Sequence, residues 1–286
     1  MMRATFLKLG EYADFVKIEH TVFALPFAYL GAFVAQKGWF GFRTFILITL
    51  AFTGMRTVAM TLNRIIDREI DALNPRTSNR HLPSGRMSLR EAYAILVVAL
   101  VVYEFSAYMI NWTAFLISPI PPILAYLYPY LKRFTCLSHY FLGFVLAIAP
   151  LGGWIAIKDP MFKPCNFDPV IVMLSIAVVF WVAGFDIIYA LQDVEFDRRY
   201  GLHSLGADFG VRFAMIASAL NHAIFFILVA SSAILWNVKA LIGVILIGLL
   251  LIYEHLIAER GKIEVAFFRV NAIISPLLLL TFILTT

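Results

Sequence analysis

Nine apolar stretches follow one another along this sequence of 286 residues, and each is long enough to cross the hydrocarbon core of a bilayer as a helix. No water satisfies backbone N–H and C=O groups inside a bilayer, so stretches of this kind fold as helices that pair those groups internally. The sequence therefore predicts an all-α polytopic membrane protein with nine transmembrane helices. The predicted spans are 18–36, 42–71, 92–110, 113–131, 138–157, 168–197, 211–235, 238–257 and 265–284.

The composition excludes a soluble domain. Hydrophobic residues make up 62% of the chain and charged residues only 14%, and the mean hydropathy is +0.85. The formal net charge of +5 comes from basic residues scattered among the loops, not from a block that would bind nucleic acid. We expect a single domain over residues 1–286 that contacts membrane lipid and binds no nucleic acid, and the sequence implies no protein partner.

The basic residues also predict how the chain is oriented. With the N-terminus inside, 17 Lys and Arg residues fall on the cytoplasmic side and five on the opposite side. This asymmetry follows the positive-inside rule. We expect an integral protein of the plasma membrane whose second and sixth spans end at the cytoplasmic face.

Those two spans both end in acidic residues. Steps of four and seven residues return to nearly the same side of an α-helix, so each set forms one stripe. Facing carboxylate stripes suit Mg²⁺, which takes oxygen ligands and shares its shell with phosphate oxygens and water. Solvated helix ends are the alternative, and two such stripes on apolar spans make it the weaker one. The stripes are Asn63, Asp67 and Asp71, and Asp186, Gln192, Asp193 and Asp197.

Asp186 lies about 10 Å deeper in the bilayer than Asp193, because an α-helix rises 1.5 Å per residue. A charge at that depth is costly, so Asp186 must face a cavity or a partner such as Arg56. A metal-diphosphate site at the mouth of an apolar chamber would suit a substrate with a charged head and a long apolar tail.

The two stripes and their surroundings resemble the UbiA-type superfamily of intramembrane aromatic prenyltransferases. The first stripe is followed by Asn-Pro-Arg-Thr at 74–77 and Leu-Pro-Ser-Gly-Arg at 82–86. Tyr-Pro-Tyr-Leu-Lys-Arg at 128–133 belongs to the same resemblance, which covers nearly the whole chain. The run Glu-His-Thr-Val-Phe-Ala-Leu-Pro-Phe at 19–27 is similar to that of the 4-hydroxybenzoate polyprenyltransferase-like branch.

This resemblance implies Mg²⁺-dependent transfer of a prenyl chain from a polyprenyl diphosphate to a small aromatic acceptor such as 4-hydroxybenzoate, with release of diphosphate, in quinone biosynthesis. The helices would surround a central apolar chamber that opens to the cytoplasm. Bound Mg²⁺ would neutralise the leaving diphosphate, and aromatic rings would protect the allylic cation from water. The expected metal ligands are Asp67, Asp71, Asp193 and Asp197.

The remaining candidates would act on the two substrates. Asp186 would orient or deprotonate the acceptor hydroxyl. Asn63 would support the metal-phosphate cluster, and Tyr189 would stack on the cation or bond the diphosphate. Guanidinium and ammonium groups would bind the diphosphate oxygens. The substrate-binding candidates are Arg68, Arg76 and Lys132, the weaker candidates Lys17, Arg80 and Arg133, and, from the resemblance, Tyr128.

Two alternatives stay open. The same chemistry could use another acceptor, such as homogentisate, a lipid alcohol or a porphyrin alcohol. An ion-coupled transporter would also carry carboxylates in the membrane, but acidic stripes gathered at one face beside basic loops fit diphosphate better. His81, His203, His222 and His255 show no metal-ligand spacing, so the sequence does not predict a zinc site.

Overall fold

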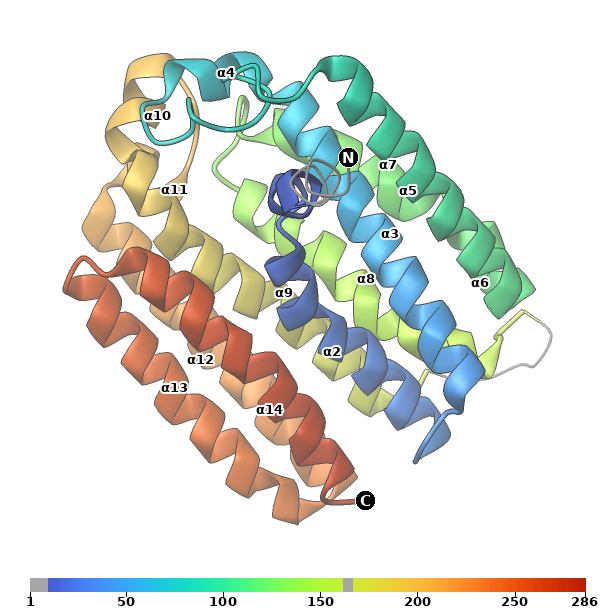
Figure 1. The fold of residues 1–286 in the computed structure, drawn as a ribbon. Helices are drawn as coiled ribbons and strands as arrows, with labels where there is room; N and C mark the ends of the chain where they lie inside the picture. Colours follow the sequence, from blue (N-terminus) through green and yellow to red (C-terminus); the bar gives the residue numbers. More distant parts are fainter. Residues whose placement is uncertain (1–9, 162–166) are drawn as a thin grey trace.

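A computed structural model describes residues 10–161 and 167–286, and for Ile18, His20, Val22 and Phe23 it describes the backbone alone. Across the described residues the regular structure is entirely helical (Figure 1). Residues 10–15 are also helical. The elements are α2 (Ile18–Gln36), α3 (Phe42–Ile66), α4 (Arg68–Leu73), α5 (Leu89–Ile110), α6 (Trp112–Ile117), α7 (Ile120–Leu131), α8 (Ser138–Lys158), α9 (Pro169–Ala190), the 3₁₀ turn η1 (Leu191–Asp193), α10 (Val194–Tyr200), α11 (Leu205–Phe209), α12 (Val211–Trp236), the 3₁₀ turn η2 (Val238–Ala240), α13 (Leu241–Glu259), the π-helix η3 (Val265–Val270) and α14 (Asn271–Ile283).

The predicted membrane architecture is confirmed in its main feature. In the described part of the chain, eight helical segments are long and apolar enough to cross a bilayer. The first predicted span is α2, a helix of 19 residues whose described apolar part, Ala24–Gln36, is shorter than that limit. The number nine therefore stays a prediction.

Several predicted spans are interrupted. The second span was expected to be one helix to residue 71, but α3 ends at Ile66 and α4 starts at Arg68. The sixth was expected to be one helix to residue 197, but α9 ends at Ala190 and a 3₁₀ turn follows. The fourth is divided between α6 and α7 beside Pro119, whose ring cannot donate a backbone hydrogen bond.

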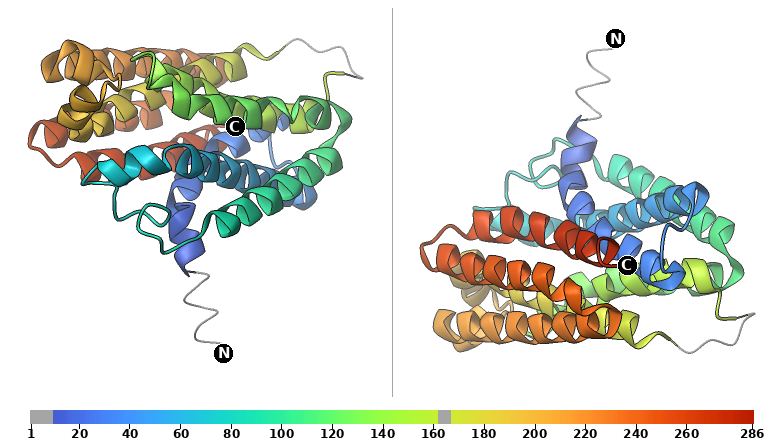
Figure 2. Two further views of the ribbon diagram at one scale, coloured as in Figure 1. Left: turned by 90° about the horizontal axis from the view of Figure 1, so that it is seen from above. Right: turned by 90° about the horizontal axis from the view of Figure 1, so that it is seen from below.

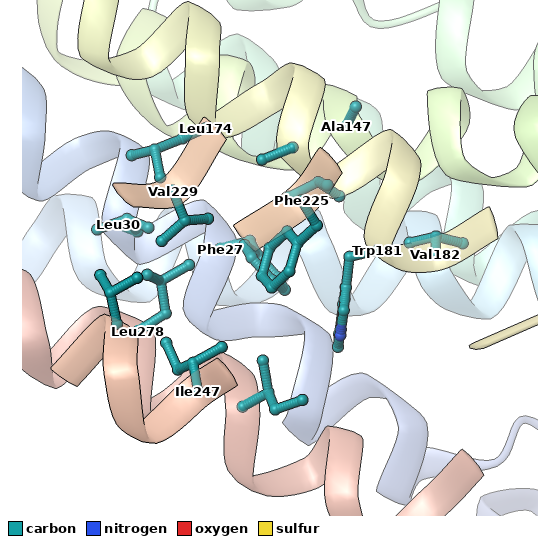
Figure 3. Close-up of a cluster of buried hydrophobic side chains, with 14 of the residues drawn as sticks. Phe27, Leu30, Ala147, Leu174, Trp181, Val182, Phe225, Val229, Ile247 and Leu278 are labelled. Carbon is teal, nitrogen blue, oxygen red and sulfur yellow. The ribbon is translucent and has the colours of Figure 1, made fainter. Parts of the chain in front are cut away.

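Helix α9 is the centre of the bundle. The apolar part of the segment Pro169–Tyr200, which begins with α9, is 67% buried, against 17–44% in the other candidate spans. Helix α9 packs against α8 and α12, while α3, α5 and α7 lie to one side and α12, α13 and α14 to the other (Figures 1 and 2). Trp181 of α9, Phe27 of α2 and Phe225 of α12 meet in the core between these helices (Figure 3).

Glycines let three of these helices approach closely. A Cβ on Gly31 of α2 would lie 1.9 Å from the Pro150 carbonyl oxygen of α8, and one on Gly153 of α8 would lie 1.9 Å from that of Ala28. A Cβ on Gly143 would lie 2.3 Å from the Val179 oxygen of α9. Lipid gives little hydrophobic drive for helix association, so this close packing is a main source of stability.

The last span begins with a π-helix, which is rare and leaves backbone carbonyls without their usual partners. The Nδ2 group of Asn271 donates to the carbonyls of Ala266 and Phe267, at 3.3 and 2.9 Å. It also donates to Oε1 of the fully buried Glu254 of α13 at 2.9 Å. These bonds fix the π-helix, whose side chains form part of the chamber described next.

Candidate active site

A cavity of about 630 Å³ lies between α2, α3, α7, α8, α9 and η3. Its volume is in the range typical of sites for small organic ligands. One part of the wall is apolar and aromatic, and another carries charged and polar groups. The polar lining residues are Lys17, Glu19, Arg56, Asn63, Arg64, Arg80, Tyr128, Asp186, Tyr189, Glu264 and Arg269. A chamber is therefore present between the helices, with a more polar wall than expected, and its opening to the cytoplasm stays a prediction.

The first acidic segment lies where α3 gives way to α4. Asp67 interrupts the helix with φ −89° and ψ 3°, but its N–H still donates to the Asn63 carbonyl at 3.0 Å. The N–H of Asp71 donates to the Asp67 carbonyl at 2.7 Å. Nδ2 of Asn63 donates to Asp67 Oδ2 at 3.1 Å, so these two side chains share the predicted face.

Both carboxylates of this segment are buried beside basic side chains. Lys132 of the α7 C-terminus places Nζ 2.5 Å from Asp67 Oδ2, and the Arg133 guanidinium lies 3.9 Å from Oδ1. Burial raises the pKa of Asp67, and the charge of Lys132 only partly offsets this effect. Nη1 of Arg80 lies 2.8 Å from both carboxylate oxygens of Asp71.

The second acidic segment repeats this backbone pattern. Asp193 ends the 3₁₀ turn with φ −109° and ψ 4°, close to the values at Asp67, and a short helix follows in both places. The hydroxyl of Ser204 donates to Asp197 Oδ2 at 3.1 Å. Figure 1 shows α4, α10 and α11 at the same end of the bundle.

Two side chains from the loop after α4 join the segments. Asn74 Nδ2 donates to Asp193 Oδ1 at 2.8 Å, and Arg76 Nε donates to the same oxygen at 2.9 Å. Nη2 of Arg76 pairs with Asp193 Oδ2, and its Nη1 donates to the Tyr189 hydroxyl at 2.8 Å. Burial alone would lower the pKa of Arg76, but these bonds raise it above the ordinary value. These hydrogen bonds hold the loop after the first acidic segment against the second acidic segment.

The donor set fits a hard divalent cation that also binds phosphate. The four predicted ligands are carboxylates, and Asp67 Oδ1 is buried without a hydrogen-bond partner among the described residues. Within those residues no group of three or more Asp, Glu, His or Cys side chains converges on one point. Oxygens from a diphosphate would have to complete each metal shell, as is common for Mg²⁺.

The structure sorts the other predicted residues. Lys17 and Tyr128 line the chamber, and so do the candidates Asn63, Asp186 and Tyr189. Lys17 also pairs with Asp14 at 2.6 Å.

Arg68 does not line the chamber: it lies 3.3 Å from the exposed carboxylate of Glu69. Arg80, predicted as a weaker candidate, lines the chamber instead.

Three residues in or beside the chamber were not among the site residues predicted from the sequence, although Arg56 was named as a residue that should face a cavity or pair with Asp186. Arg56 and Arg64 line the chamber, and Nε of Arg56 and both Nε and Nη1 of Arg64 are buried without a hydrogen-bond partner in the described part of the chain. His139, the second residue of α8, lies with Nδ1 2.7 Å from Asp186 Oδ2. A lone arginine within an apolar span was a usable signal for Arg56. No spacing pattern pointed to His139.

Comparison with known proteins supports the same assignment. The model of the UbiA prenyltransferase family matches residues 24–273. The chain belongs to this family. It is therefore an integral membrane prenyltransferase, and the transporter alternative is excluded.

Its relatives cover most of the chain. A 4-hydroxybenzoate octaprenyltransferase of Pseudoalteromonas translucida is 29% identical over 271 residues, which are 92% of this chain and 90% of that protein. One of a Marinomonas species is 30% identical over 206 residues, 71% of each. The apo structure of a UbiA homolog from Aeropyrum pernix has 35% identity and a TM-score of 0.84, and covers 93% of this chain and 98% of that one. A UbiA homolog from Archaeoglobus fulgidus bound to GPP and Mg²⁺ shares the fold, with 22% identity, a TM-score of 0.68 and coverage of 95% and 99%.

Proposed function

We propose that this prenyltransferase joins a polyprenyl chain to 4-hydroxybenzoate, with Mg²⁺ as its metal and diphosphate as the leaving group, as a step in quinone biosynthesis. The relatives named 4-hydroxybenzoate octaprenyltransferase support this acceptor. The observation that carries the proposal is the arginine in the middle of α3, which gives the chamber a group suited to an aromatic acid.

Arg56 is a fixed positive charge deep in the membrane-spanning part of the chamber. It lies about 21 Å along α3 from Phe42, at a rise of 1.5 Å per residue. Its Nε is buried and has no partner among the described residues. Leaving a buried N–H donor unpaired is costly, and a carboxylate satisfies a guanidinium through two parallel hydrogen bonds. The carboxylate of 4-hydroxybenzoate would supply that partner, whereas an uncharged alcohol would not.

The donor would bind at the acidic end of the chamber. Mg²⁺ bound there would stabilise the negative charge that develops on the departing diphosphate. Asp67, Asp71, Asp193 and Asp197 would hold the metal, and Asn63 would support Asp67. Arg76, Arg80 and Lys132 already lie against three of these carboxylates, so diphosphate oxygens would meet their charges at the same place.

The aromatic wall would protect the allylic cation. The Phe267 ring centroid lies 4.3 Å from that of Tyr189 and 5.4 Å from that of Phe185. All three rings line the chamber beside Asp186. Ring faces attract positive charge and exclude water, which would otherwise capture the cation.

The setting of the enzyme follows from the charge distribution of the sequence. We propose nine transmembrane helices in a single domain of the plasma membrane, the N-terminus inside and the chamber mouth toward the cytoplasm. Membrane lipid would surround it, and the proposed reaction implies no protein partner.

The test is acceptor choice by the purified protein in detergent with geranyl diphosphate and Mg²⁺. We expect prenylation of 4-hydroxybenzoate and much weaker use of 4-hydroxybenzyl alcohol, which lacks the carboxylate. Arg56→Met should raise the KM for 4-hydroxybenzoate about 10- to 100-fold, as expected for loss of a charged hydrogen bond of about 1.5–3 kcal/mol. It should change the use of the alcohol much less.

Arg43→Met is the matched control. Arg43 is the second residue of α3, away from the acidic end of the chamber, and donates to the Met109 carbonyl at 2.8 Å. Homogentisate, also an aromatic acid, is tested in parallel. Equal use of acid and alcohol, or preference for homogentisate, would contradict the proposed acceptor.

A further inference from the structure

Asp186 and His139 form a dyad at the chamber wall. Asp186 comes from α9 and lines the chamber, with 16% of its side chain exposed. His139 comes from the first turn of α8, is 3% exposed and does not line the chamber. Their 2.7 Å hydrogen bond engages Oδ2 of Asp186 and leaves Oδ1 for a ligand.

The surroundings of the imidazole determine which nitrogen carries the proton. Nε2 of His139 is buried and has no hydrogen-bond partner within the described ranges. A proton on Nε2 would bury an unsatisfied donor, whereas a bare Nε2 buries only an acceptor lone pair, which proteins tolerate better. The proton therefore belongs on Nδ1, which donates to Asp186, and Asp186 accepts it as a carboxylate.

We propose that His139 is a positioning residue for the prenyl transfer: it holds Asp186 as an ionised base directed at the phenol of the aromatic acceptor. The inference rests on the proposed function, because a base at this point is useful only to an acceptor with an ionisable hydroxyl. It goes beyond that function by assigning the activation of the acceptor to a pair of residues and a role to a histidine outside the chamber.

The proposed step balances. The phenol O–H bond breaks and its proton goes to Asp186 Oδ1, which leaves a phenoxide whose ortho carbon is electron-rich. The C–O bond to diphosphate breaks with its electron pair on the diphosphate, and the ortho carbon forms the new C–C bond. The ortho C–H proton then passes to a diphosphate oxygen while Asp186 returns its proton to the ring oxygen. One proton leaves with the diphosphate.

The experiment compares two acceptors in His139→Leu and His139→Gln. In 3-fluoro-4-hydroxybenzoate the fluorine lowers the pKa of the phenol, so this acceptor depends less on a base. For 4-hydroxybenzoate we expect His139→Leu to lower kcat about 100-fold, the scale of lost general-base help. For the fluorinated acceptor the ratio of wild type to variant should shrink at least several-fold. Binding of geranyl diphosphate with Mg²⁺ should be unchanged.

His139→Gln retains a side-chain N–H donor and should recover most of the lost kcat. His255→Leu is the control for removal of another histidine, since His255 contacts His222 at 3.0 Å and does not line the chamber. Equal defects with both acceptors, loss of donor binding, or no recovery by glutamine in a folded protein would overturn the role of His139. Failure of the wild type to prenylate either acid would instead overturn the proposed function, and this inference with it.

Discussion

The acidic segments at the ends of α3 and α9 share a backbone shape but differ in their surroundings. Each places its first aspartate at a break between a spanning helix and a short one, with nearly equal φ and ψ. The side chain of Asp67 is 2% exposed and lies against Lys132, whereas that of Asp193 is 16% exposed and is bound by side chains of a distant loop. The first carboxylate is part of the buried structure, and the second lies at the open edge of the site.

This difference indicates two kinds of role within one site. Asp67 is held by charges that the fold cannot lose without exposing a buried carboxylate to an apolar environment. Asp193 is held by Asn74 and Arg76, whose loop joins the two halves of the site. We expect substitutions in the first segment to lower the free energy of unfolding more than those in the second. We expect substitutions in either segment to lower the reaction rate.

The largest expected effect tests what the segments have in common. Asp67→Asn and Asp193→Asn should each lower the rate of Mg²⁺-dependent diphosphate release about 100-fold or more, because each removes a negative ligand that acts on the developing charge. Product formation from geranyl diphosphate and 4-hydroxybenzoate gives the measurement. A normal rate in either variant would show that the segments are not equivalent in chemistry.

The next effect tests how they differ. Lys132→Met should lower the free energy of unfolding by about 3 kcal/mol, because Asp67 is almost fully buried and would keep only the amide of Asn63 and the more distant Arg133 beside it. Arg76→Met should cost less, because Asp193 is more exposed and keeps its bond to Asn74. Thermal unfolding of the two variants in the same detergent makes the comparison. A larger loss in Arg76→Met would reverse the assignment of the buried segment.

The smallest effect concerns the hydroxyl at Asp197. Ser204→Ala should cost about 1 kcal/mol of stability, because Ser204 both caps α11 and donates to the carboxylate. Ser84→Ala, in the loop after α4, is the control and should change stability little, because its hydroxyl makes only two long contacts: it donates to the His81 carbonyl at 3.5 Å and accepts from Nε of the exposed Arg86 at 3.3 Å. Equal losses of stability in the two variants would contradict a specific stabilising role for the Ser204 hydroxyl.

The sequence predicts much of this arrangement because apolar length and four-residue spacing are local properties. It identifies the helical membrane fold and places Asn63 and Asp67 on one face, as their hydrogen bond confirms. The breaks at Asp67 and Asp193 are not predictable in the same way, because neither position carries a proline or glycine. They depend on contacts with the rest of the fold.

The dependence on tertiary contacts also explains why the sequence does not show which arginines and histidines contact the carboxylates. Arg68 was expected to bind diphosphate because it follows the first acidic residue, but its guanidinium lies against Glu69, the next residue in the chain. Arg76 meets Asp193 across 117 residues of sequence, and His139 meets Asp186 across 47. Such pairs are created by the packing of α8, α9 and the loop after α4, so no pattern along one segment can reveal them.

The glycine contacts between α2 and α8 also bear on how the protein is assembled during synthesis. Helix α2 is made first, but its closest backbone contacts are with Pro150 and Gly153, more than a hundred residues later. Its other large contact is with α14, near the end of the chain. The first helix must therefore wait in the membrane for partners that emerge late, and the chamber can close only when translation is nearly complete.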